Sequence, residues 1–346
     1  MTDEKLTDTG SWRPGVSRRL RFGRKALRIV VSIVVTIGLL MVTSLIVIPK
    51  NDQTAAGETY AYANGFEGLA KNSLDVLFIG DSEAYTSLSP MQMWKEQGFT
   101  AYTSSTPGQH LTYGNTLLHR ALSCQTPKIV VFETDFFYKD VDVSSAMSRT
   151  AQDAFPVLEY HNRWKSLTLA DFTSLPNATW TDDNRGFAIK TAVKEADATG
   201  YMAPSSDVAQ ISSVNLAYIK AMVAYCRSKG VTPIFVSTPS VKNWSMSKHN
   251  GVEQIASELG VDYVDLNLGD AATSIDIDWS TDSLDGGDHL NYSGAEKVSA
   301  YLGAYLKETY GLTDHRDDSS YSTVWNASLT QYESNLASAG ATESAS

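Results

Sequence analysis

A serine, a histidine and two aspartates stand in segments that could meet and perform acyl chemistry. Ser82 lies in "LFIGDSEAYTSLSP", where a hydrophobic run breaks at Gly-Asp-Ser, and His289 lies in "DSLDGGDHLNYSGA" after Asp285 and Asp288. A serine becomes a nucleophile when a base accepts its proton, and a histidine base needs a carboxylate that orients its ring. The residues therefore predict attack on an acyl carbonyl by Ser82, with His289 as the general base.

Each of these residues has a simpler interpretation when it is taken alone. Gly-Asp-Ser is usually a turn in which Asp81 caps backbone N–H groups, and an isolated loop histidine usually bonds a nearby carbonyl. The combination of serine, histidine and aspartate favours the catalytic interpretation. The histidines and the two cysteines show no metal-ligand spacing, so we expect no metal and no cofactor.

Alternating strand and helix patterns predict the elements that would position these residues. Short apolar runs alternate with helical periodicity, which indicates a doubly wound parallel α/β sheet of about five strands. In such a sheet, ligands bind at the carboxyl ends of the strands, where Ser82 is expected. The expected strands are 75–80, 100–105, 128–134, 232–239 and 262–266, and the expected helices are 90–97, 113–122, 213–228, 252–259 and 293–310.

Two further segments do not follow this alternation. Residues 138–212 form an insertion too long for a structureless loop, so we expect some helix there, covering one edge of the site. Within it, His161, Arg163 and Trp164 either contact substrate or pack the insertion onto the domain. Residues 313–346 are rich in Ser, Ala and Thr, and we expect a partly disordered extension.

The N-terminus has the composition of a membrane anchor. Residues 29–49 contain no charge over 21 positions, and residues 1–28 carry eight basic against three acidic residues. This pattern predicts a transmembrane helix with a cytoplasmic tail, a stalk over 50–72 and an extracytoplasmic domain over 73–312. A cleaved signal peptide is the alternative, but its apolar region is usually shorter.

The exported part of the chain is acidic. The net charge of −11, less the +5 of residues 1–28, leaves −16 beyond the tail, which disfavours nucleic acid as a partner. Outside the cytoplasm Cys124 and Cys226 could form a disulfide if the two helix ends at which they are expected are neighbours. Two separate buried thiols are the favoured interpretation.

The segments "FIGDSE" and "DGGDHLNYSGAEKVSAYL", in this order, resemble the SGNH hydrolases, also called GDSL esterases and acyltransferases. The resemblance implies a flavodoxin-like fold, with Ser82 as nucleophile, His289 as base and an aspartate upstream as its partner. Asp285 precedes the histidine by four residues and is preferred, and Asp288, one residue before it, is the alternative.

The resemblance also implies an oxyanion hole. Its donors would be the backbone N–H of Ser82 and that of Gly108 in "TPGQH", where a turn glycine is the plain alternative. The third donor in the family is an asparagine, but this chain has "FETDFFY", so Thr134 or a backbone N–H would substitute. Losing such a donor costs about 10²–10³ in rate.

A single anchor with an exported domain resembles the membrane-anchored bacterial branch, which includes the teichoic acid D-alanyl transfer protein and the alginate O-acetylation proteins. This implies an esterase or O-acyltransferase at the bacterial plasma membrane, an acylated cell-envelope glycan or polymer as substrate, and a membrane-bound O-acyltransferase as partner. The alternative is a catalytically inactive binding or scaffold protein with the same fold.

Overall fold

The computed structural model describes residues 16–50, 60–174 and 180–341, with side chains from residue 24 onward. Its centre is a five-stranded parallel sheet in the order β2-β1-β3-β4-β5, which is the flavodoxin-like doubly wound order and confirms the predicted fold class. Each strand begins and ends within two residues of its predicted bounds. The strands are β1 (Val76–Gly80), β2 (Ala101–Ser105), β3 (Ile129–Glu133), β4 (Thr232–Ser237) and β5 (Asp262–Asp265).

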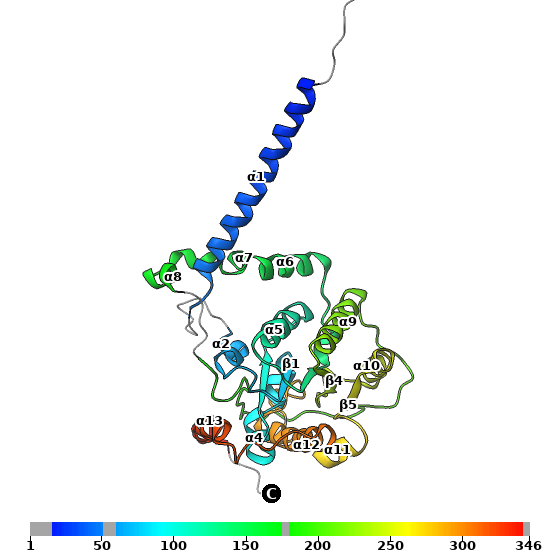
Figure 1. Cartoon of the computed structure of the whole chain (residues 1–346). Coiled ribbons are helices and arrows are strands. Elements are labelled where there is room, and N and C mark those ends of the chain that lie inside the picture. Colours follow the sequence, from blue (N-terminus) through cyan, green and yellow to red (C-terminus); the bar gives the residue numbers. More distant parts are fainter. Residues whose placement is uncertain (1–15, 51–59, 175–179, 342–346) are drawn as a thin grey trace, which may run out of the picture.

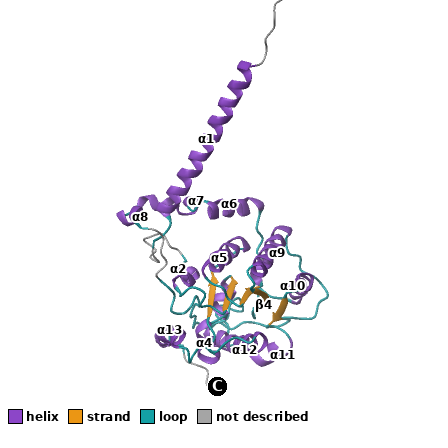
Figure 2. Cartoon of the chain, in the orientation of Figure 1, coloured by secondary structure: helices purple, strands orange, loops and turns teal. Residues whose placement is uncertain are grey.

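Both faces of the sheet are covered by helices (Figures 1 and 2). The side chains of each strand alternate between the two faces. In β1, Leu77 and Ile79 join the core beneath α5 (Leu111–Cys124), α9 (Ser213–Ser228) and α10 (Met246–Leu259). Val76 and Phe78 join the opposite core, which contains residues of α4 (Pro90–Gln97), α11 (Gly269–Ile275) and α12 (Tyr292–Tyr310). Because apolar side chains fill both faces, the strands read as continuous hydrophobic runs.

The folded body extends beyond both ends expected for it. Residues placed in the expected stalk form α2 (Ala61–Asn64) and the 3-10 turn η2 (Gly65–Gly68), and Phe66 is fully buried. At the other end α13 (Ser319–Ser338) packs Trp325 against Trp94 of α4. The sequence did not predict these helical segments, because their anchoring aromatic side chains find partners far away in the chain. Residues 51–59 of the expected stalk and the last five residues lie outside the described part of the chain.

The insertion divides into two halves. The first contains α6 (Val143–Ala154), α7 (Val157–Tyr160), the 3-10 turn η4 (His161–Lys165) and α8 (Leu169–Thr173), all lying across the end of α1 in Figure 1. The second half, residues 180–212, has no helix or strand and runs back along the domain.

One helix in the described residues, α1 (Val16–Val47), is long and apolar enough to cross a membrane. Its candidate span is Arg24–Val47, and almost none of that span is buried within the protein. The two cysteines are free thiols: Cys226 is buried and Cys124 is half-buried.

Candidate active site

The Gly-Asp-Ser segment is a tight turn between β1 and α3 (Ser82–Ser87). Asp81 caps the helix by accepting a hydrogen bond from the Glu83 backbone N–H at 2.9 Å. A side chain at Gly80 would meet the Cβ atoms of Ala84 and Glu133 at 2.7 Å, so only glycine allows this close approach. The turn thus places Ser82, which is half-buried, at the carboxyl end of a central strand.

The loop before α12, residues 283–290, holds the histidine. An isolated β-bridge between Ser283 and Leu290 closes the loop, and the Leu284 N–H donates to the His289 carbonyl at 2.9 Å. Asp285 contacts His289 twice: its Oδ1 accepts from the backbone N–H at 2.9 Å and its Oδ2 lies 2.8 Å from Nδ1 of the ring. Asp288 Oδ1 is 3.9 Å from the same nitrogen. Asp285 is therefore the carboxylate that orients the ring.

This pairing also sets the charge of Asp285. Partial burial would raise the pKa of its carboxyl, but the hydrogen bonds from the backbone and ring of His289 outweigh burial and hold the pKa below its ordinary value. The ionised Asp285 favours the tautomer with the proton on Nδ1, which leaves Nε2 as a proton acceptor.

Asn243, on the loop that follows β4, joins the serine turn to the histidine loop. Its Nδ2 donates to Glu83 Oε1 at 2.8 Å and also to Asp288 Oδ1. No hydrogen bond joins Ser82 to His289 in the described residues; the two segments are linked through Glu83, Asn243 and Asp288. Catalytic hydrogen bonds are often long before substrate binds.

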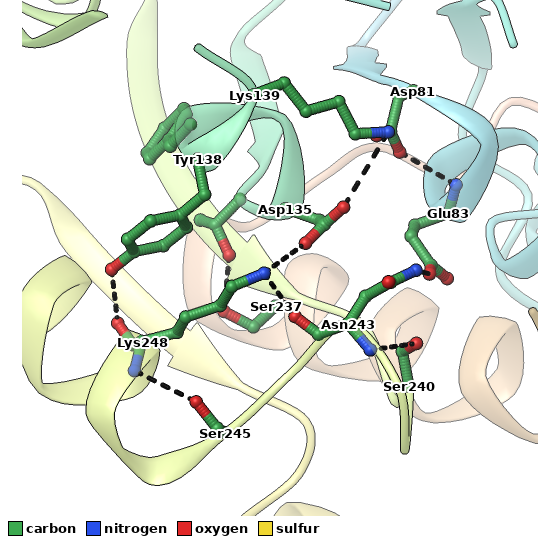
Figure 3. Close-up of polar contacts among 12 residues, drawn as sticks. Asp81, Glu83, Asp135, Tyr138, Lys139, Ser237, Ser240, Asn243, Ser245 and Lys248 are labelled. Carbon is green, nitrogen blue, oxygen red and sulfur yellow. Dashed lines mark hydrogen bonds and ion pairs between the residues drawn. The ribbon is translucent and has the colours of Figure 1, made fainter. Parts of the chain in front are cut away.

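Beneath the turn lies a cluster of carboxyl groups with two lysines (Figure 3). Lys139 forms an ion pair with the buried Asp81, and Lys248 Nζ lies 2.9 Å from Asp135 Oδ1. Burial, and then the neighbouring carboxylates Asp81 and Glu133, raises the pKa of Glu83 well above its ordinary value. Burial among other carboxyl groups thus disfavours the charged form of Glu83 relative to an exposed glutamate.

The expected oxyanion residues have unequal support. The backbone N–H of Ser82 stands in the first turn of α3, where helix geometry provides no partner for it. Gly108 is exposed, has φ +59°, and lies in the loop after β2, so its turn conformation requires glycine-like freedom.

Thr134 follows β3 and is bonded to residues at the end of β4. Its hydroxyl is fully buried and shares a hydrogen bond with Ser237 Oγ at 2.5 Å, and its N–H donates to the Val236 carbonyl at 3.0 Å. Its role as a substitute for the missing asparagine stays a prediction.

His161, Arg163 and Trp164 lie on the first half of the insertion, at the end of α1. Arg163 is buried and donates to the carbonyls of Val47 and Ile48, whereas Trp164 and His161 are exposed. The structure does not bring these three together with Ser82 and His289. Of the two expected roles, packing of the insertion is the one that Arg163 performs.

One set of possible metal ligands occurs in the described residues. Ligand atoms of Glu83, Asp288 and His289 lie within 4.8 Å of one another. Two of these carboxylate oxygens already accept from Asn243, so the protein itself provides them with a hydrogen-bond donor.

Asn243 and Glu83 are the two site residues whose placement was not predicted. Glu83 adjoins the nucleophile in sequence, and Asn243 follows the carboxyl end of a predicted strand, where ligand-binding residues gather. Its position after that strand could have suggested Asn243 as a site residue, but the sequence does not specify which residue of the loop turns toward the site.

No family model and no curated protein matches this chain. Solved structures similar to it include a GDSL-like lipase from Bacteroides thetaiotaomicron, with 11% identity, a TM-score of 0.38, and coverage of 74% of this chain and 99% of that one. A lipase/acylhydrolase from Enterococcus faecalis has 11% identity, a TM-score of 0.37, and coverage of 69% and 97%. Likeness at this level does not carry an activity from one chain to another.

Proposed function

We propose that this chain is an SGNH-type serine esterase or O-acyltransferase, anchored by α1 in the bacterial plasma membrane with its α/β domain outside. The observation that carries the proposal is the pair formed by His289 Nδ1 and Asp285 at 2.8 Å, on a loop linked through Asn243 to the turn that presents Ser82. A histidine oriented in this way is suited to accept a proton through Nε2.

In the proposed reaction, Ser82 Oγ attacks the carbonyl carbon of an acyl ester while His289 takes the hydroxyl proton. The backbone N–H groups of Ser82 and Gly108 stabilise the oxyanion. Collapse of the tetrahedral intermediate breaks the bond to the alcohol, which leaves with the proton from His289 and yields an acyl-serine. Water then gives hydrolysis, whereas a sugar hydroxyl gives transfer.

The substrate that we propose is an acylated glycan or polymer of the cell envelope. The exported position of the domain favours an envelope substrate, and the net charge of −16 on residues 29–346 favours a neutral or ammonium-bearing polymer over a polyphosphate. A membrane-bound O-acyltransferase would supply the acyl group if the reaction is transfer.

A catalytically inactive scaffold is the second candidate. The observation that favours it is that the Thr134 N–H donates to the Val236 carbonyl and its hydroxyl is bonded to Ser237, in place of the asparagine side chain that the resemblance implies.

The test is covalent labelling of the full chain in detergent micelles by a fluorophosphonate probe. We expect labelling of the wild type that is lost in Ser82→Ala and in His289→Ala. Ser334→Ala, which removes an exposed serine on α13, is the matched control and should label normally. A folded wild-type chain that takes no label would contradict the enzyme and favour the scaffold.

A further inference from the structure

Large apolar side chains are exposed on one short part of the domain. Outside α1, the described residues include nine large apolar side chains that are strongly exposed, and six of them fall within residues 143–173. We call the segment from α6 to α8 the α6–α8 platform. Its exposed apolar residues are Val143, Met147, Leu158, Trp164, Leu169 and Phe172. A patch of this kind on a folded protein indicates an interaction surface.

The platform is fixed to the end of α1 by buried polar contacts. Arg163 donates to the Val47 carbonyl at 2.6 Å and to the Ile48 carbonyl at 2.9 Å, which satisfies carbonyls that the helix end leaves free. The same guanidinium lies 2.8 Å from Asp171 of α8, and both side chains are buried. The Val157 N–H at the start of α7 donates to Ser44 Oγ at 3.0 Å. The platform and the last turn of α1 are therefore one packed unit.

The position of this contact along α1 sets its depth in a membrane. The uncharged run begins at Ile29, and a helix needs about 20 residues, or about 30 Å, to cross the hydrocarbon core. The outer boundary then falls near Ile48, and Ser44 lies about 6 Å inside it. Interfacial amphipathic helices insert their apolar faces about 5–10 Å into the same region.

The opposite side of α6 is occupied by the domain. Arg149 lies over the Tyr113 ring of α5, and Asp153 accepts from Thr116 Oγ1 at 2.8 Å. Val143 and Met147, four residues apart, share a different face of the helix and point away from these contacts. Figure 1 shows α6, α7 and α8 running across the axis of α1, with the sheet domain beyond them.

We propose that the α6–α8 platform lies in the outer headgroup region of the membrane that α1 spans, with its six exposed apolar side chains inserted among the lipids. The occupant of this surface is the lipid bilayer because the surface is continuous with the membrane helix and lies at the depth of the interface. Trp164, with Lys165 Nζ 5.8 Å from its ring centroid, is a residue pair typical of that region. The platform holds the domain at a fixed height and tilt. This inference rests on the proposed anchor but not on the proposed catalysis.

The experiment uses the full chain in phosphatidylcholine–phosphatidylglycerol vesicles that contain lipids with a doxyl quencher at acyl carbon 5 or 12. Single cysteines replace Leu169, Met147, Leu39 or Val324 in a Cys124→Ser background, and each carries a bimane fluorophore. Cys226 is fully buried and remains. Leu39 on α1 reports insertion of the anchor, and Val324, half-exposed on α13, is the matched surface control.

We expect the carbon-5 quencher to reduce fluorescence at Leu169 and Met147 at least about threefold more than at Val324, and the carbon-12 quencher to act most strongly at Leu39. Quenching at Leu39, with Leu169 and Met147 behaving like Val324, would overturn the platform proposal and indicate a protein partner for the patch. No quenching at Leu39 would overturn the anchor and the platform together. Ester hydrolysis and fluorophosphonate labelling are independent of both outcomes.

Discussion

The two halves of the insertion differ in what they contact. The α6–α8 platform contacts the end of α1 and exposes apolar side chains. The half from 180 to 212 borders the histidine loop through backbone hydrogen bonds: the Lys194 N–H donates to the Ser283 carbonyl at 2.9 Å, and the Gly286 N–H donates to the Lys194 carbonyl at 3.1 Å. One insertion between β3 and β4 thus contacts both the end of α1 and the histidine loop.

Different interactions shape the two regions. The histidine loop is fixed by directional hydrogen bonds, which position a reacting group within tenths of an ångström. The platform's exposed face is apolar, and burial of apolar surface has no preferred direction, so it suits a fluid lipid surface. Substitutions in the platform should therefore leave the histidine loop intact, and substitutions in the histidine loop should leave the platform intact.

The largest effect is expected at His289. His289→Ala should lower kcat/KM for a soluble acetyl ester by about 10³–10⁴-fold, because the serine loses its base. The matched change on the platform, Leu169→Ala with Phe172→Ala, should leave kcat/KM unchanged in detergent. An equal loss in the platform variant would show that the two regions are coupled.

A smaller effect separates the two aspartates near the histidine. Asp285→Asn should lower kcat/KM by about 10²–10⁴-fold because the amide no longer favours the required tautomer. Asp288→Asn should cost less than about tenfold, since Asp288 bonds Asn243 and is 3.9 Å from the ring. Steady-state kinetics of the two variants decide between them, and the reverse order would make Asp288 the partner. Because the pKa of Asp285 is lowered, its carboxylate should stay ionised down to below pH 4.

The stability of the contact between α1 and the platform, here called the joint, should depend on Arg163. Arg163→Met leaves the buried Asp171 without its partner and should destabilise the joint by about 3 kcal/mol. Hydrogen exchange of the full chain in lipid vesicles would show this as exchange more than about 100-fold faster in α7 and α8. Lys220→Met, which breaks the exposed pair with Glu258, is the control and should change local exchange little. Unchanged exchange in α7 and α8 would mean that apolar packing alone holds the joint.

The smallest effect concerns Glu133, in the carboxyl cluster, and the pH dependence of the free energy of unfolding. Burial, and then the charges of Asp81 and Asp135, raises the pKa of Glu133 well above its ordinary value. The folded chain therefore keeps a proton that the unfolded chain releases. The resulting stability is complete below the ordinary pKa, near 4.3, and is lost as pH rises toward the folded pKa.

Glu133→Gln cannot ionise, so it should gain about 1 kcal/mol in the free energy of unfolding at pH 8 relative to wild type, with little gain at pH 4. Urea unfolding of the full chain at the two pH values measures this difference. Glu308→Gln, at an exposed position on α12, should show no such pH dependence. A gain of equal size at both pH values would point to packing instead of ionisation.

Much of the fold could be predicted because its signals are local. Continuous apolar runs such as "VLFIG" form strands buried on both faces, and glycine at position 80 marks the tight turn before Ser82. The alternation of strands with helices leaves few topologies once crossovers must be right-handed. The positions of α13 and of residues 60–68 were not predictable in this way, since their anchors Trp325 and Phe66 find partners far away in sequence.

The sequence by itself determined the anchor-like helix, the parallel sheet and the presence of a serine, a histidine and two aspartates at its expected edge. Only the tertiary structure decided that Asp285 bonds the ring, that Asn243 links the two loops, that Thr134 bonds Ser237, and that Arg163 contacts α1. The composition and periodicity of a segment predict which face of a helix or strand is buried. Hydrogen bonds depend on directions and distances of a few ångströms between residues far apart in the chain, and these exist only after folding.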